Sequence, residues 1–293
     1  MRIGLIDVDS HNFPNLALMK ISAYHKGRGD YVEWWNGLQH YDRVYKSRVF
    51  DDTYSQDIEY YINADEIVKG GTGYDLTNKL PDEIEHQCPD YSLYGITDRA
   101  YGFLTRGCPR HCPFCIVSAK EGNTHTVADL DEFWTGQREI VLMDSNITAS
   151  KDCDRLFDQL IQSGALINFE GGLDIRLLTD KGADQLNRMR TSMIHFAWDN
   201  YEFGTYEKLK HFRPLLDTDD RHLRVYVLTN FNTNTAQDLE RIYKLKELGY
   251  DPFVMVYNKA HAQKVTRQIQ RWCNNKFVFR SCDRFDDYKG AQA

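Results

Sequence analysis

Three cysteines lie close together in one short segment of the chain. The segment Gly102-Phe-Leu-Thr-Arg-Gly-Cys-Pro-Arg-His-Cys-Pro-Phe-Cys115 gives them the spacing C-x3-C-x2-C, at Cys108, Cys112 and Cys115. Thiolates hold iron–sulfur clusters, and a cubane normally takes four of them. Three thiolates leave one iron with an open coordination position, where a substrate or cofactor can bind, as in a catalytic zinc site. The spacing therefore predicts a [4Fe-4S] cluster with one open position.

The same cysteines could instead hold a structural zinc ion. Such an ion takes four ligands, and His111 could supply the fourth. The chain would then be a non-catalytic binding protein stabilised by zinc. A cluster could also stabilise a binding protein that lacks turnover. The remaining cysteines do not form a compact set along the sequence, so an auxiliary cluster is not expected.

The composition is that of an ordinary globular protein. The chain has 293 residues, of which 42% are hydrophobic and 27% charged. No apolar run approaches the roughly 20 residues that span a bilayer, and the N-terminus turns acidic too early for a secretion signal. Seven cysteines, three of them clustered, favour metal chemistry in a reducing compartment. We therefore expect a cytoplasmic protein. The net charge of −7 does not favour nucleic acid as a partner.

Residues 1–95 are expected to form a small Rossmann-like α/β domain. Short apolar runs typical of buried parallel strands alternate with one amphipathic segment. The expected strands are at residues 3–8, 31–35, 41–50 and 64–69, and the expected helix is at residues 15–26.

From Ala100 onward, strand and helix alternate six times, which predicts a partial (β/α)6 TIM-type barrel over residues 96–262. The expected strands are at residues 101–106, 139–143, 166–170 with 173–176, 192–198, 223–228 and 251–257, and the expected helices at 127–134, 152–163, 179–190, 206–216 and 235–248. A last helix at 263–274 opens a C-terminal tail, residues 263–293. Active sites of barrels lie at the carboxyl ends of the strands, and the cysteine segment follows the first one.

With Phe114 before the third cysteine, this motif resembles that of the radical S-adenosylmethionine (SAM) superfamily. In that family three cysteines hold a [4Fe-4S] cluster, and SAM chelates the fourth iron through its amino and carboxylate groups. One electron then cleaves SAM to methionine and a 5′-deoxyadenosyl radical, which abstracts hydrogen from the substrate. The resemblance implies a radical SAM enzyme with an unidentified substrate and a flavodoxin- or ferredoxin-like electron donor.

The N-terminal part resembles the domain that precedes the barrel in cobalamin-binding radical SAM enzymes. The resemblance lies in the segment that begins at Pro14 and in Gly70-Gly-Thr-Gly73. Asp9-Ser-His11 is similar to the start of the cobalamin loop D-x-H-x-x-G, but Pro14 stands in place of its glycine. This departure favours a degenerate domain that does not bind cobalamin. A bound cobalamin would instead indicate a cobalamin-dependent methyltransferase.

Polar residues at the ends of the expected barrel strands are the candidates for contacts with SAM. Asp144-Ser-Asn146 is similar to the Asp-x-Asn variant that holds the methionyl amine in cobalamin-type relatives, although Asp and Asn are also turn and cap residues. Asp174 and Arg176 share one face by the period of two, as site residues or as an internal salt bridge. The remaining candidates are Asp199, Asn200, Thr229 and Asn230 for the ribose or substrate, and Tyr257 and Phe114 for the adenine.

Overall fold

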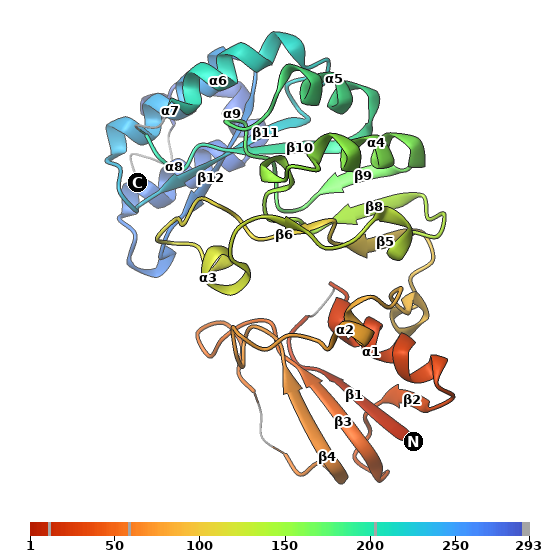
Figure 1. The fold of residues 1–293 in the computed structure, drawn as a ribbon. Coiled ribbons are helices and arrows are strands. Elements are labelled where there is room, and N and C mark those ends of the chain that lie inside the picture. The colour runs from red at the N-terminus through yellow and green to blue at the C-terminus, as the bar shows by residue number, and fades with distance from the viewer. Residues whose placement is uncertain (11–12, 58–59, 202–203, 289–293) are drawn as a thin grey trace. The chain divides into compact units, whose positions relative to one another are not determined.

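The fold contains two parallel sheets, which the computed structural model describes over residues 1–10, 13–57, 60–201 and 204–288 (Figure 1). The smaller sheet holds β1 (Arg2–Asp7), β2 (Tyr31–Trp34), β3 (Tyr41–Ser47) and β4 (Ala64–Gly70). Its order is β2-β1-β3-β4, and each neighbouring pair is parallel. All four strands confirm the sequence prediction.

Helix α1 (Leu16–Gly27) covers one face of this sheet. Asn15 starts it, because its side chain accepts a hydrogen bond from the backbone N–H of Leu18 at 3.2 Å. Leu18 and Ile21 pack with Ile3 and Leu5. The opposite face is covered by Trp35 and Ile62, and residues 35–40 join β2 to β3 without a helix, so the sheet is not doubly wound there.

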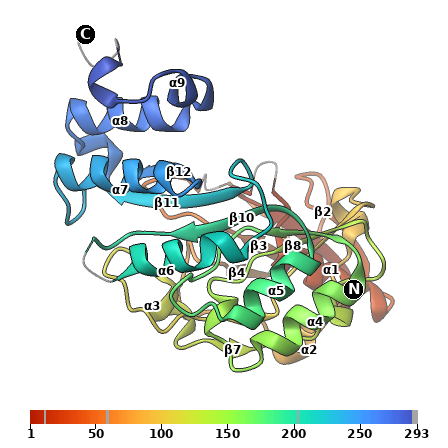
Figure 2. The same cartoon turned by 90° about the horizontal axis from the view of Figure 1, so that it is seen from above.

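The larger sheet has six strands in the order β12-β11-β10-β9-β8-β5, consistent with a partial barrel. Its strands are β5 (Arg99–Gly102), β8 (Glu139–Leu142), β9 (Leu166–Phe169), β10 (Arg190–Ala197), β11 (Leu223–Thr229) and β12 (Asp251–Val256). Figures 1 and 2 show the crossover helices along it: α4 (Cys153–Ser163), α5 (Asp180–Arg188), α6 (Thr205–Phe212) and α7 (Thr235–Glu247). These helices confirm the predicted alternation from the second strand onward.

Three predicted elements of the barrel are wrong. The predicted strand at 101–106 is divided into β5 and the short β6 (Thr105–Arg106), which belongs to a two-stranded sheet with β7 (His125–Thr126). Gly102 ends β5 where Phe133 packs against it so closely that a Cβ would overlap the ring. The predicted helix at 127–134 is only a 3-10 turn at Leu130–Glu132. After β9, Leu173 makes a single bridge to Phe196 and the chain then turns, instead of forming a strand over 173–176.

Short helices occur where none was predicted. They are α2 (Asp82–Glu85), α3 (Val117–Glu121) and α9 (Lys276–Ser281). The last of these joins the predicted C-terminal helix, α8 (Lys264–Asn274), in an apolar core around Trp272, Phe279 and Phe285. None of the helices in the described part of the chain combines the length and apolarity needed to cross a bilayer.

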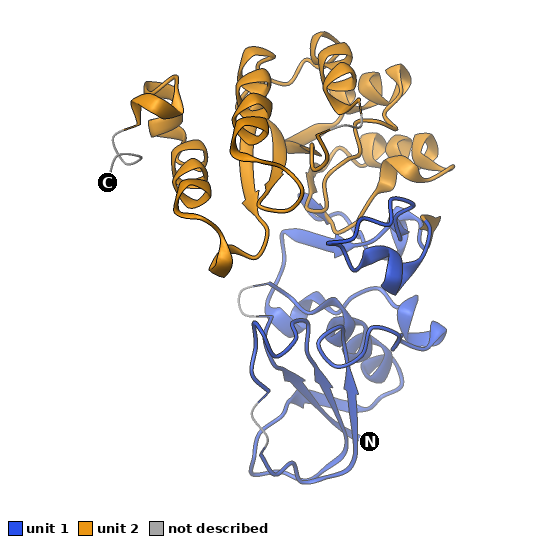
Figure 3. Ribbon diagram, turned by 90° about the vertical axis from the view of Figure 1, so that its left-hand side faces the viewer, with its two compact units in different colours: residues 1–123, 127–141 blue, residues 124–126, 142–293 orange. Residues whose placement is uncertain are grey.

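The chain divides into two compact units, drawn in blue and orange in Figure 3. Unit 1 comprises residues 1–123 and 127–141, so it includes the small sheet and the cysteine segment; unit 2 comprises residues 124–126 and 142–293. The domains expected at 1–95, 96–262 and 263–293 stay predictions.

Candidate functional site

The cysteine loop, residues 107–116, begins at a glycine that no other residue could replace without strain. Gly107 has a φ of +85°, and a Cβ there would overlap the backbone carbonyl of Asn123. The next residue, Cys108, donates its backbone N–H to the carbonyl oxygen of Gly122 at 3.0 Å. The two ends of the segment 107–122 are thereby held side by side.

The interior of the loop is irregular, and its cysteines are at least partly exposed. His111 has a φ of +45°, in the left-handed region that histidine tolerates better than most residues. The backbone N–H of Cys115 donates to the carbonyl of Cys112 at 3.0 Å, so the second and third cysteines lie in one tight turn. Cys115 is exposed, and Cys108, Cys112 and Phe114 are partly exposed. A ligand can therefore reach these thiols from solvent.

The donor set of this loop fits an iron–sulfur cluster. Among the described residues, no group of three or more His, Cys, Asp or Glu side chains is placed to hold a metal ion. A [4Fe-4S] cluster has a different requirement, because its cysteines bind at separate corners of a cube and not around one centre. Three thiols on an accessible loop supply the chemistry of three such corners.

In unit 2, the turn after β8 packs against the segment after β9. Asp144 and Asn146 are both buried. The Thr148 hydroxyl donates to the side-chain oxygen of Asn146 at 2.9 Å and accepts from the backbone N–H of Asp174 at 3.0 Å. A Cβ on Gly171 would overlap the backbone carbonyl of Asp144, so glycine permits this close approach.

Asp174 and Arg176 form a bidentate ion pair with each other. The guanidinium Nε and Nη2 donate to the two carboxylate oxygens at 2.8 and 3.0 Å. The carboxylate side chain is almost buried and the arginine is partly exposed. The sequence left a site pair and a salt bridge open as alternatives; the structure shows the salt bridge, with its arginine accessible to a ligand.

Asp199 follows β10 and is influenced by this pair. Burial raises the pKa of its carboxyl group to about 6; Asp174 raises it further, whereas Arg241 and Arg176 oppose the rise. Asp199 and its neighbour Asn200 are both partly exposed. A carboxyl group with a pKa close to neutrality can hold or release a proton, which makes Asp199 the most chemically versatile candidate on these strand ends.

The ends of β11 and β12 are joined to each other. The side-chain amide of Asn230 donates to the carbonyl of Tyr257 at 2.8 Å, and the backbone N–H of Tyr257 donates to the carbonyl of Thr229 at 3.0 Å. Tyr257 is 42% exposed, and its ring lies edge-on to Phe231. Thr229 is fully buried, and its hydroxyl donates to the backbone carbonyl of Met255. Tyr257 and Asn230 are thus open to solvent, whereas Thr229 is buried, as are Asp144 and Asn146.

Sequence reasoning missed two groups near these strand ends. Arg241 of α7 is fully buried and donates to the carbonyls of Trp198 and Leu228, at 2.6 and 2.7 Å. The sequence signal for a buried arginine was its position on the apolar face of the predicted helix. His195 and Tyr226 stack at 5.2 Å on neighbouring strands, and burial lowers the pKa of His195. The period of two in each strand could have identified that pair.

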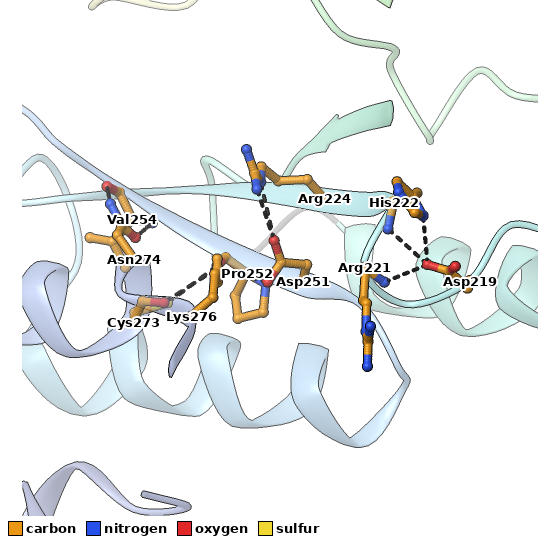
Figure 4. A network of polar contacts seen from close by, with 10 residues as sticks. All are labelled: Asp219, Arg221, His222, Arg224, Asp251, Pro252, Val254, Cys273, Asn274 and Lys276. Atoms are coloured by element: carbon orange, nitrogen blue, oxygen red, sulfur yellow. Dashed lines mark hydrogen bonds and ion pairs between the residues drawn. The ribbon is translucent and has the colours of Figure 1, made fainter. Parts of the chain in front are cut away.

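The amino ends of the same strands carry a polar network that fits a structural role. Asp251 accepts from Arg224 at 3.1 Å and from Lys276 at 2.7 Å (Figure 4). Nearby Cys273 is buried, and burial raises the pKa of its thiol to about 12; burial also raises that of Cys153 to about 12. Both therefore remain protonated at neutral pH, unlike metal-ligating thiolates.

No protein-family model and no curated protein matches the chain. Among solved structures, its fold is similar to that of TsrM from Kitasatospora setae, a radical S-adenosylmethionine methyltransferase with cobalamin and a [4Fe-4S] cluster bound. The TM-score is 0.64 at 11% identity, over 87% of this chain and 74% of TsrM. SuiB from Streptococcus suis, bound to S-adenosylmethionine, matches with a TM-score of 0.44 at 11% identity, over 71% of this chain and 53% of SuiB. At such identities the likeness to TsrM shows a shared fold, and nothing further is inferred from SuiB.

Proposed function

We propose that this chain is a radical SAM enzyme, in which Cys108, Cys112 and Cys115 hold a [4Fe-4S] cluster. One combination supports this proposal: a C-x3-C-x2-C loop with accessible thiols occurs in a chain that shares its fold with TsrM over 87% of its length. When bound, the cluster would supply the electron that cleaves S-adenosylmethionine reductively. A flavodoxin- or ferredoxin-like protein is the proposed electron donor.

The strand ends of unit 2 would bind S-adenosylmethionine. Arg176 is held in place by Asp174, so it offers an oriented guanidinium to a carboxylate. Asp144 and Asn146 would accept from the methionyl ammonium, and Asp199 with Asn200 would contact the ribose hydroxyls. Asn230 would contact the ribose or the substrate, and the exposed Tyr257 would receive the adenine. In the cysteine loop, Phe114 would shield the cluster. In this role each residue binds and orients the ligand.

A cobalamin-dependent methyltransferase is the second candidate, because TsrM contains cobalamin. In a parallel sheet of order β2-β1-β3-β4, a ligand would bind beyond the carboxyl ends of β1 and β3, where the strand order reverses. Here Asp9 is buried and accepts from the backbone N–H groups of Val49 and Phe50, each at 2.8 Å. The side-chain amide of Asn15 donates to the hydroxyl of Ser47, the last residue of β3, at 2.8 Å. His11, of the cobalamin-like sequence, lies outside the described residues.

These contacts engage Asp9 and Asn15 within the protein, and they favour the enzyme without cobalamin. In the same proposal, residues 1–95 form a degenerate domain, 96–262 the barrel and 263–293 the C-terminal tail.

The test is anaerobic reconstitution of the full chain, followed by iron, sulfide and cobalt analysis and by reaction with dithionite and S-adenosylmethionine. We expect about four irons and four sulfides per chain, with release of 5′-deoxyadenosine. Alanine at Cys108, Cys112 or Cys115 should abolish both. Cys88→Ala is the matched control, because Cys88 is exposed but lies outside the loop.

Other results of this experiment would support other functions for the chain. Cobalt bound along with the cluster would support the methyltransferase. Zinc without sulfide would contradict the proposal and leave a zinc-stabilised binding protein. A stable cluster without cleavage of S-adenosylmethionine would leave a cluster-stabilised binding protein.

A further inference from the structure

Four alternating charges form a continuous chain of ion pairs in unit 1. Lys20 of α1 donates to a Glu85 carboxylate oxygen at 2.9 Å, and Arg106 donates to the same oxygen at 3.3 Å. Arg106 also donates to Glu121 at 3.0 Å, through its other terminal nitrogen. The order is therefore Lys20, Glu85, Arg106 and Glu121, and it runs from the helices beside the small sheet to the cysteine loop.

The last two charges stand on either side of that loop. Arg106 lies two residues before Cys108, and Glu121 lies six residues after Cys115. The second carboxylate oxygen of Glu121 accepts from the backbone N–H of Gly107 at 3.0 Å. One carboxylate thus binds both the side chain that precedes the loop and the first backbone N–H within it. Displacing Glu121 would release the start of the loop.

The chain of charges is shielded enough to hold a defined geometry. Its side chains are between 12% and 28% exposed, and such partly desolvated networks exceed isolated surface pairs in strength. Burial opposes ionisation of Glu85, yet Lys20 and Arg106 outweigh burial, and the pKa of Glu85 is lowered. Phe103 supports the Arg106 guanidinium, whose carbon lies 3.9 Å from the ring centroid.

A second connection joins the cysteine loop to the glycine turn of the small sheet. Lys120, on α3, donates to the hydroxyl of Thr72 in Gly70-Gly-Thr-Gly73. A Cβ on Gly71 or Gly73 would overlap the carbonyl oxygen of Arg48 or Phe50. The glycines therefore let the turn pack against the chain beyond β3, where its threonine can hold α3.

We propose that the small sheet serves to position the cysteine loop, and that Arg106 and Glu121 are its positioning residues. The elements around the sheet hold the loop through the charge chain and through the contact of Lys120 with Thr72. The effect on a bound cluster rests on the function proposed above; the effect on the loop itself does not.

The experiment uses the full chain, reduced and free of iron, and compares Glu121→Gln and Glu85→Gln with wild type. Glu83→Gln is the matched control, because Glu83 is an exposed glutamate of α2 outside the charge chain. Two rates are measured by mass spectrometry. The first is the rate at which iodoacetamide labels the three loop cysteines, with Cys88 as internal reference. The second is the rate of amide hydrogen exchange over residues 107–121. We expect about tenfold faster labelling and exchange in Glu121→Gln, the factor that loss of one charged hydrogen bond produces. Glu85→Gln should give a smaller increase, and Glu83→Gln none.

The reconstituted protein gives a readout that simple loosening of the loop would not produce. The reduction potential of the cluster should rise in Glu121→Gln, which removes a negative charge, and fall in Arg106→Gln, which removes a positive one. Arg106→Lys keeps the charge but cannot bind both carboxylates, so it should loosen the loop with little change in potential. If Glu121→Gln does not fold, Arg106→Lys replaces it in the labelling experiment.

Equal labelling in wild type, Glu121→Gln and Glu85→Gln would overturn the proposal, as would an equal increase in Glu83→Gln. Potentials that move in the same direction in Glu121→Gln and Arg106→Gln would overturn it too. If wild type takes up no iron and sulfide, the proposed function fails, and the labelling experiment still decides whether the loop is positioned in this way.

Discussion

Asp199 shows how a tertiary environment changes the chemistry of one side chain. Its carboxyl group has a pKa of about 6 instead of 3.8, chiefly because it is buried. The native protein therefore binds more protons than the unfolded chain between those pH values. Stability contributed by this group is present at about pH 4 and is lost as the pH rises through 6.

Asp199→Asn should consequently stabilise the protein at pH 7.5, by about 1 kcal/mol after allowance for partial exposure. At pH 4 the difference should be much smaller, because Asp199 is then neutral in the native protein and only partly ionised in the unfolded chain. Urea unfolding of the full chain between pH 4 and 8 measures this, with Asp220→Asn, an exposed carboxylate, as control. The same stabilisation at pH 4 and pH 7.5 would show that Asp199 is not held protonated.

At the scale of elements, α7 holds the carboxyl ends of two strands together. Its Arg241 binds carbonyl groups beyond β10 and within β11, and it pairs with Asp238 at 2.6 Å. Both charged side chains are almost completely buried. A buried pair of this kind is costly to break, because the remaining charge and carbonyl groups lose their partners in a medium that excludes water.

Arg241→Met should therefore lower the free energy of unfolding by about 3–5 kcal/mol. The methionine fills much of the space but donates no hydrogen bonds. Arg271→Met, on the exposed side of α8, is the control and should change stability by less than about 0.5 kcal/mol. Adding Asp238→Asn to Arg241→Met should restore part of the loss, because it removes the unpaired buried charge; strictly additive losses would argue against the pairing.

At the scale of the whole molecule, unit 1 contains a group of partly buried carboxylates that makes it sensitive to acid. Burial opposes ionisation of several of its carboxylates, but cationic and hydrogen-bonding partners outweigh it and lower their pKa values. The described examples with largely buried side chains are Asp30, Glu33, Asp57, Glu85 and Asp90. In unit 2, three carboxylates with lowered pKa values have well exposed side chains: Asp219, Glu240 and Asp283.

A lowered pKa contributes stability above about pH 4.5 that is lost as the pH falls through the native value. We therefore expect unit 1 to lose protection at a higher pH than unit 2 during acid titration. Pulsed hydrogen exchange with mass spectrometry between pH 5 and 2 should show amides of residues 1–123 exchanging first. Earlier exchange in residues 142–288 would contradict this distribution of charge.

The sequence alone predicted most of the elements, and it placed three cysteines in one short segment. Apolar runs of strand length predicted β1 to β4, and helical periodicity with end signals predicted α1, α4 and α7, because burial of one face is a local property of the sequence. It also identified the three cysteines that could ligate iron, because residue type and spacing can be read from the sequence. It failed at Gly102 and in the segment after β9, where packing against Phe133 and Asp144 ends the strand pattern.

Only the tertiary structure decided how charged side chains are used. Lys20 and Arg106 meet at Glu85 from positions 65 residues before it and 21 residues after it. No local pattern encodes such a meeting, because it depends on the path of the backbone between them. The same holds for the pKa of Asp199, which is set by burial and by charges on Asp174, Arg176 and Arg241. Which side chains could bind a metal depends on residue type, which the sequence states directly. The pKa of a carboxyl group and the geometry of a loop depend on the surroundings that folding creates.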